Sequence, residues 1–310
     1  MSSRTRRIAA ALTVTAALTA VLPGLVSSAS AATVHPAAAN GTKGTSLTIS
    51  TGSPYVVMNG TTVDFGVDVR DLSWSPNGQQ AAFIDGSGNL DVANPNGTGR
   101  RIVAANPGNQ VWSHPTWQVA PADSRDGVQA KDNLFFAVSK KGVTRLEGVS
   151  ATANHGTPYL LTLGHEAGPG VAQNPLTGNA WPSAAGEYGT AVYENTGNGE
   201  VYIRDDYIRQ QGAALVRGSE PALSPNGEEV VFVRSVGGHD HIFEESFDTQ
   251  HPVAKDLTPH ATGNDTEPTW SPDGLTIAFR TATGTDVVPA NGSKAPVQLT
   301  SYVGLAAFRG

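Results

Sequence analysis

The sequence of 310 residues has no cysteine, only two methionines, and charged residues at just 15% of its positions. A chain without cysteine has no disulfide, no thiolate nucleophile and no cysteine-ligated metal site, so its core alone must stabilise it. After residue 40 no stretch keeps a 3.6-residue apolar period over three turns, which argues against long amphipathic helices. The G-x-S-x-G motif of hydrolase nucleophiles is also missing, which argues against an α/β-hydrolase domain.

Turn-forming residues are abundant instead, with 35 glycines and 20 prolines. This composition is typical of an all-β protein built from many short strands. Acidic residues outnumber basic ones, for a net charge of −7. Because such a chain is repelled by phosphate backbones and anionic lipids, we expect no nucleic-acid partner and no binding to membrane surfaces.

The N-terminal segment has the organisation of an export signal. Three arginines precede an apolar stretch over residues 8–26, and an Ala-Ser-Ala triplet ends at Ala31. This order is typical of a Sec signal peptide, and we predict cleavage after Ala31. An uncleaved membrane anchor is the alternative, because the apolar stretch approaches spanning length. Cleavage would remove the three arginines and change the net charge from −7 to −10, and no second apolar span follows.

Three segments repeat one pattern, namely Ser73–Ile84, Leu223–Val233 and Trp270–Arg280. Each contains Ser-Pro-Asn/Asp-Gly followed by an apolar strand. Proline presets φ at the second turn position and glycine accepts positive φ at the last, so each segment predicts a tight turn between two strands. Partial copies anchored at Trp117 and Trp181 bring the total to five units, which begin near residues 70, 114, 178, 220 and 267. Units of about 40 to 45 residues are typical of four-stranded propeller blades.

The two ends of the chain complete a sixth blade. Three predicted strands between residues 46 and 67 have no inner strand, whereas Val303–Phe308 repeats the inner-strand position without outer strands. Pairing between these ends closes the ring and leaves no open edge. We therefore predict an all-β, six-bladed β-propeller over residues 45–310, after a signal peptide (1–31) and a linker (32–44), with the closing blade shared by N- and C-terminal strands. A piece of a longer protein is the alternative.

The repeats resemble the WD40-like blades of the TolB family of propellers. Trp270–Arg280 matches the family's blade pattern almost throughout, and the other two full copies match it well. The resemblance implies a six-bladed propeller that binds other envelope proteins. TolB has an additional N-terminal domain that the short segment before residue 45 does not supply, so a role in a Tol–Pal system is not expected. The export signal and low lysine content resemble those of secreted actinobacterial proteins.

Four polar residues make up the candidate ligand-binding site. His114 and Glu267 precede Pro-Thr-Trp, and Glu220 precedes Pro-Ala-Leu, so the three occupy equivalent positions at the start of inner strands. With Arg70 they should line one mouth of the channel, where loops on a rigid scaffold commonly carry function. Ordinary polarity at strand ends is the alternative.

A second cluster has metal-ligand character. His239 and His241 flank Asp240, and in a strand the two histidines share one face about 6.6 Å apart, at ~3.3 Å per residue. A third ligand from a neighbouring blade would complete a metal site, and a polar hairpin loop is the alternative. Segments 205–206 and 263–267 are rich in side-chain oxygens, which are the ligands of calcium, so calcium is the one ion that we consider there. We expect no other cofactor.

These observations predict a secreted, monomeric, non-catalytic module that binds an extracellular protein, peptide or cell-wall component at one face of the ring. We favour binding over catalysis because no motif places a catalytic Ser, His and Asp together. The alternative is a propeller enzyme that acts on an extracellular glycan or peptide through carboxylates at the channel mouth.

Overall fold

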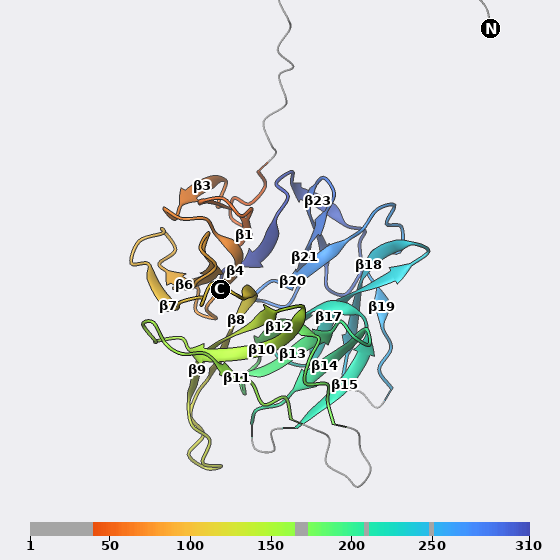
Figure 1. Ribbon diagram of the computed structural model, residues 1–310. Coiled ribbons are helices and arrows are strands. Elements are labelled where there is room, and N and C mark those ends of the chain that lie inside the picture. Colours follow the sequence, from red (N-terminus) through yellow and green to blue (C-terminus); the bar gives the residue numbers. More distant parts are fainter. Residues whose placement is uncertain (1–39, 165–172, 208–210, 248–250) are drawn as a thin grey trace, which may run out of the picture. The chain divides into compact units, whose positions relative to one another are not determined.

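The structure, a computed structural model, describes residues 40–164, 173–207, 211–247 and 251–310. These residues form strands and turns, and the strands make six four-stranded sheets arranged around a central axis (Figure 1). The predicted all-β, six-bladed propeller is therefore confirmed. Within this described part, no helix is long and apolar enough to cross a membrane. The predicted signal peptide and most of the predicted linker lie outside the described residues.

Each sheet runs from an inner strand beside the axis to an outer strand, and five sheets use four consecutive strands. The first of these contains β4 (Arg70–Trp74), β5 (Ala81–Ile84), β6 (Leu90–Ala93) and β7 (Arg101–Ala104). The next contains β8 (Val111–Ala120), β9 (Lys131–Lys140), β10 (Val143–Ser150) and β11 (Tyr159–Leu160). The third contains β12 (Asn179–Ala185), β13 (Thr190–Asn195), β14 (Glu200–Arg204) and β15 (Gly212–Arg217).

The remaining two consecutive sheets complete the arc. One contains β16 (Ser219–Leu223), β17 (Glu229–Val236), β18 (His239–Ser246) and β19 (Lys255–Asp256). The other contains β20 (Thr266–Trp270), β21 (Thr276–Thr281), β22 (Gly284–Pro289) and β23 (Val297–Thr300). Residues 139–189, a loop-rich range whose strands the sequence does not define, contribute the end of β9 and all of β10, β11 and β12. Residues 165–172 in this range are not described.

The sixth sheet joins the two ends of the described chain. It contains β24 (Leu305–Phe308), β1 (Leu47–Ser50), β2 (Tyr55–Met58) and β3 (Thr61–Asp64). The antiparallel register places Leu47 opposite Phe308 and Ser50 opposite Leu305. Strand β24 also contacts β20 and β4, its neighbours around the ring. The shared closing blade is therefore confirmed. Just before it, the backbone N–H of Gly41, a residue assigned to the linker, donates to the carbonyl of Leu299 at 3.1 Å.

The repeated Ser-Pro-Asn/Asp-Gly motif forms the same turn in three sheets. The N–H of Gly78, Gly227 and Gly274 donates to the carbonyl of the motif's serine at 2.8 to 2.9 Å. The φ values of these glycines, 63° to 79°, lie in the left-handed region that a side chain disfavours. The serine hydroxyl also bonds the Asn or Asp two residues later. The sequence repeat is therefore a repeat of one local structure.

Apolar side chains fill the spaces between neighbouring sheets. Among the described residues, six buried clusters occur, each built from two adjacent sheets. In one of them Trp112 of β8 lies 4.9 Å from Phe136 of β9, centroid to centroid, and packs with Ile84 of β5. Each sheet is thus covered on both faces, which holds the inner strands at defined positions around the axis.

Candidate functional site

Five of the six inner strands bend at one equivalent residue. Asp71, His114, Trp181, Glu220 and Glu267 all have left-handed φ values, from 50° to 55°. Each lies where the ladder to the next strand is interrupted, as in a β-bulge. Left-handed φ is uncommon for such side chains, so its recurrence marks a position that the surrounding packing enforces.

This geometry corrects two alignments made from the sequence. The counterpart of His114 in the β4–β7 sheet is Asp71, whereas the predicted site residue Arg70 lies one position earlier and donates to the Asp85 carbonyl at 3.4 Å. The repeat pattern aligns Trp181 with Trp117 as the anchor of a unit, but Trp181 occupies the bulge itself. The sequence does not separate the two cases, because a tryptophan can stand either at the anchor position or at the bulge. Only strand pairing distinguishes these positions.

Carboxylates at this end of the ring bind the backbone of the next blade. The N–H of Glu267 donates to Glu220 Oε2 at 2.7 Å, and the N–H of Glu220 donates to Glu194 Oε2 at 2.8 Å. Asp71 Oδ2 accepts the N–H of His114 at 3.2 Å. Three pairs of neighbouring blades are therefore joined by a carboxylate that accepts a bulge N–H, which the bulge removes from the ladder. The carboxylate belongs to the bulge residue itself in two pairs and to Glu194 of β13 in the third.

Burial sets the charge of these carboxyl groups. It raises the pKa of Glu220 to about 7, opposed by the N–H of Glu267 and assisted by the charges of Glu267 and Glu194. Burial also raises the pKa of Glu267, opposed by Arg280, whose Nη1 lies 2.5 Å from Glu267 Oε1. Glu220 is therefore partly protonated at neutral pH.

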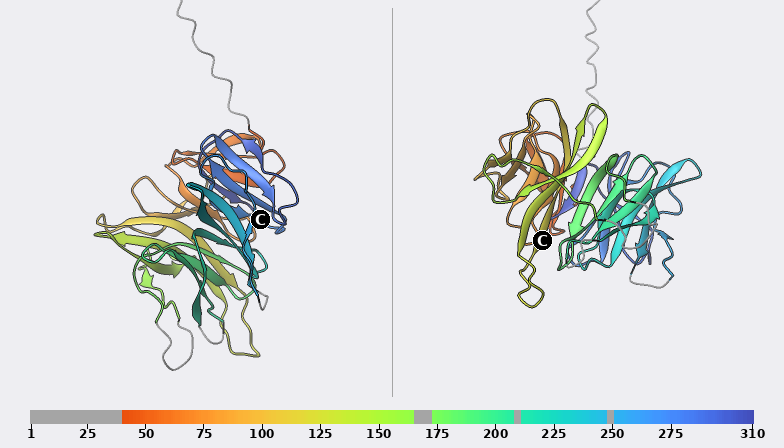
Figure 2. Two further views of the ribbon diagram at one scale, coloured as in Figure 1. Left: turned by 90° about the vertical axis from the view of Figure 1, so that its right-hand side faces the viewer. Right: turned by 60° about the horizontal axis from the view of Figure 1, so that its bottom comes forward.

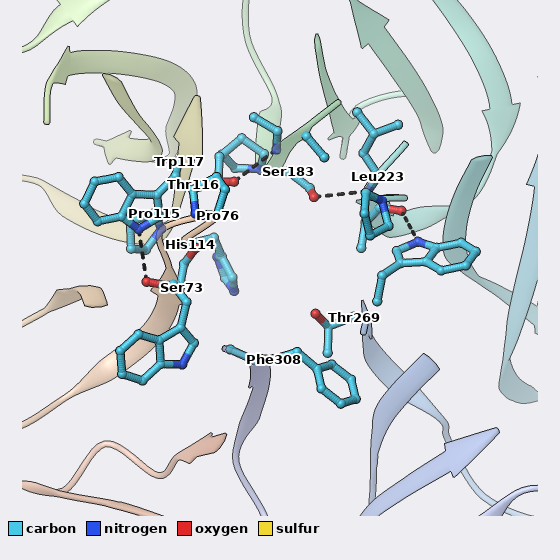
Figure 3. Close-up of a pocket in the computed structure, with 18 of the residues that line it drawn as sticks. Ser73, Pro76, His114, Pro115, Thr116, Trp117, Ser183, Leu223, Thr269 and Phe308 are labelled. Atoms are coloured by element: carbon cyan, nitrogen blue, oxygen red, sulfur yellow. Dashed lines mark hydrogen bonds between the residues drawn. The ribbon is translucent and has the colours of Figure 1, made fainter. Parts of the chain in front are cut away.

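His114 and Trp181 form an aromatic pair at the same end. Their rings stack with centroids 3.6 Å apart and planes inclined by 30°. Burial lowers the pKa of His114, opposed by the charge of Asp71, so the imidazole is neutral at pH 7. Figure 3 shows this ring pointing into the space between the inner strands. The pair offers a ligand an uncharged, flat surface.

A cavity of about 380 Å³ lies on the axis and is lined by residues of all six inner strands. Its wall is mainly apolar, formed by prolines, tryptophans and alanines, with hydroxyls at Thr116, Ser183 and Thr269 (Figure 3). Among the described residues of this lining, Asp71 is the one acidic side chain and no lysine or arginine takes part. The volume falls in the range of about 300–1,000 Å³ that is usual for ligand pockets.

Hydrogen bonds between blades hold this wall. Trp117 and Trp270 each donate the indole N–H to a carbonyl of the preceding inner strand, at 3.1 and 3.0 Å. At the closing sheet Thr48 relays the same bond, since its hydroxyl accepts the Trp74 N–H at 2.9 Å and donates to the Ala307 carbonyl at 2.8 Å. A wall that is ordered before a ligand arrives lowers the entropic cost of binding.

The four predicted ligand-binding residues are not all in the cavity wall. His114 lines it, but at Glu220 and Glu267 the following prolines form the wall instead. The sequence analysis missed Trp181 and Asp71 as site residues. The signal for Trp181 was available, because Trp-Pro repeats the residue-Pro pairs at His114, Glu220 and Glu267.

The predicted metal-binding histidines lie on β18, the third strand of its sheet. His241 is buried, with Nδ1 2.9 Å from Asp256 Oδ2, whereas His239 is exposed beside the hairpin turn. Asp206, in the calcium candidate segment, pairs with Arg204 at 3.2 Å. In the described residues no group of three His, Asp or Glu side chains is placed to hold a metal ion. The metal and calcium expectations stay predictions.

No protein-family model matches the chain, and no curated protein matches its sequence. Solved structures match its fold. TolB from Acinetobacter baumannii gives a TM-score of 0.57 at 15% identity, over 85% of this chain and 65% of the length of that protein. A TolB candidate from Agrobacterium tumefaciens gives 0.53 at 18% identity, over 77% of this chain and 83% of that one. At such identities the likeness concerns the fold alone, and this chain has the β-propeller fold of TolB-like proteins.

Proposed function

We propose that this protein is a non-catalytic binding module that holds an extended, uncharged segment of a partner polypeptide in its central channel. The observation that carries the proposal is the cavity of about 380 Å³, whose wall is mainly apolar. A fixed apolar wall with a few hydroxyls favours burial of uncharged groups and orients them by hydrogen bonds. The export signal predicted at the N-terminus supports an extracellular partner.

The carboxylates at the channel end support binding over catalysis. Glu220 and Glu267 are absent from the cavity wall and bind the Glu267 N–H and Arg280. Asp71 lines the wall, and one of its oxygens accepts the His114 N–H. A general acid or nucleophile needs an oxygen that reaches the substrate. One observation favours the enzyme alternative, namely the Glu220 pKa of about 7, which suits proton transfer at neutral pH.

A peptide selection against the purified protein tests the proposal. Thr269 points into the channel (Figure 3), so Thr269→Trp places an indole there. Thr62→Trp makes the same change at an exposed position of β3 and serves as the matched control. Selected peptides should bind the unchanged protein and T62W equally, and T269W about tenfold more weakly, a loss of about 1.4 kcal/mol.

Two results would overturn this assignment. Equal affinity of the selected peptides for T269W would place their site outside the channel. Release of fragments from a glycan or peptide substrate, abolished in Glu220→Gln with binding retained, would establish the enzyme alternative.

A further inference from the structure

A second cavity, of about 350 Å³, lies beside the channel. It is formed by the β8–β9 hairpin, the β12–β13 turn and the segment after β14, and Figure 2 shows this hairpin projecting from the ring. Val119 and Gly186 line the channel, and the residues that follow them, Ala120 and Glu187, line the second cavity. The two cavities are therefore adjacent.

Two tyrosines supply the aromatic surface of this cavity. The rings of Tyr188 and Tyr207 have centroids 4.3 Å apart and planes inclined by 37°. Tyr188 is 44% exposed, so its ring is accessible to a ligand. The faces of such rings carry negative charge density and attract cations placed over them.

Two carboxylates crowd the hydroxyl of Tyr207. Its oxygen lies 2.6 Å from Asp123 Oδ2 and 2.8 Å from Asp126 Oδ2. A phenol has one proton, so it donates to one carboxylate while the other faces its lone pairs. Glu187 adds a third negative charge to the lining. None of these three carboxylates has an ion-pair partner among the described residues. Arg125 adds one positive charge to the lining, so three carboxylates and one guanidinium leave it net negative, which favours a cation as ligand.

Buried groups hold the two tyrosine segments in position. Gln118, only 1% exposed, donates from Nε2 to the Gly189 carbonyl and to Asp206 Oδ2, each at 2.9 Å. Lys131 Nζ donates to the carbonyl oxygens of Tyr188 and Asp206. Both tyrosines are thereby tied to the β8–β11 sheet, which sets the separation of their rings before a ligand arrives.

We propose that this cavity binds a guanidinium group, the side chain of an arginine in a protein or peptide ligand. The group would lie against the rings of Tyr188 and Tyr207 and donate to the carboxylates of Asp123 and Asp126. A guanidinium suits this arrangement because it is planar, stacks on aromatic faces and forms two parallel bonds to carboxylates. The site goes beyond the proposed channel function and does not require an occupied channel.

The probe for this site is Nα-acetyl-arginine amide, and Nα-acetyl-citrulline amide is its uncharged isostere. NMR titration of the full chain at low salt should show binding of the arginine probe, with about tenfold weaker binding or worse for citrulline. Rising salt should weaken the arginine probe alone, because exposed charges are screened. Thr269→Trp should leave this binding unchanged, which separates the result from that of the channel.

Matched variants locate the site. Tyr188→Ala and Asp126→Asn should each lower the affinity for the arginine probe about tenfold. Tyr55→Ala and Asp64→Asn change an exposed tyrosine and an exposed aspartate of the closing sheet, and they should have no effect. Retained affinity in both Y188A and D126N would overturn the proposal.

Further results of the same titration would refute or support the arginine site. Failure of the arginine probe to bind either the unchanged protein or Arg125→Gln at its highest soluble concentration would refute the proposal, as would equal binding of citrulline. Calcium binding that is lost in D126N would also refute the proposal if the protein does not bind the arginine probe. Arg125 of this chain lines the cavity and would compete with the probe. Binding that emerges only in Arg125→Gln would support the same chemistry, with the Arg125 guanidinium as the occupant of the cavity in the unchanged protein.

Discussion

At the scale of single residues, the surroundings of Glu220 govern its chemistry. Its carboxyl is half-buried, binds the Glu267 N–H through one oxygen and lies near the carboxylates of Glu267, Glu194 and Asp240. A neutral carboxyl tolerates this site better than a carboxylate, because burial penalises charge. The pKa of Glu220 should therefore depend on how closely the neighbouring blades pack around its carboxyl.

Glu220→Gln should change the pH dependence of stability. The pKa of this carboxyl rises from 4.5 to about 7 on folding, so between these values the folded state holds a proton that the unfolded state has lost. The group's contribution is most favourable below about pH 4.5 and falls as the pH rises to about 7, by on the order of 3 kcal/mol. The amide keeps an acceptor for the Glu267 N–H but does not titrate.

Urea denaturation at successive pH values measures this effect. The decline in unfolding free energy between pH 4.5 and 7 should be smaller in E220Q than in the unchanged protein. Glu228→Gln, at an exposed glutamate, is the control and should reproduce the unchanged profile. If the E220Q profile also matches that of the unchanged protein, burial does not raise the pKa of Glu220 as inferred.

At the scale of elements, the closing strand β24 holds the ring together. It is the inner strand of a sheet whose other strands come from the opposite end of the described chain. Ala306 and Ala307 are buried in the cores on its two sides. Without β24, strand β1 would become an open edge, which invites aggregation.

Deletion of residues 303–310 should leave the protein largely unfolded, because the loss of one blade's inner strand rivals a typical net stability of about 5–15 kcal/mol. A peptide of residues 303–310 added to the truncated chain should restore folding by strand addition. The same peptide with Ala306→Asp should not, because residue 306 is only 3% exposed. Thermal melting monitored by circular dichroism measures the stability of the truncated chain alone and with each peptide. An unchanged melting midpoint in the truncated chain would refute this role of β24.

At the scale of the whole molecule, stability is shared among six cores between sheets. Every sheet contributes to the cores on both of its sides, so no sheet can unfold without exposing its neighbours. We therefore expect one cooperative thermal transition.

A single core substitution should move that entire transition. Trp270→Ala removes a side chain that is 7% exposed, packs in one core and bonds the Ala222 carbonyl, and it should cost about 3–5 kcal/mol. Trp270→Phe keeps most of the apolar contact and should cost less. Calorimetry should show one transition at a lower midpoint. A split into two transitions would show that blades unfold independently.

The sequence by itself determined the local structure and the count of blades. The Ser-Pro-Asn/Asp-Gly turns depend on φ preferences of proline and glycine within four residues, so they could be predicted without the fold. Repetition of the unit, with unpaired strands at both ends, was enough to predict six blades and the closing pair. Neither inference needs side chains that are far apart in the sequence.

The tertiary structure alone decided the chemistry of the surfaces. Pairing between strands put Asp71 rather than Arg70 at the bulge, and contact between blades raised the pKa of Glu220. The second cavity brings the Tyr207 hydroxyl to Asp123, 84 positions away in the chain. Such contacts depend on the packing of whole sheets, and no local preference of the chain encodes them.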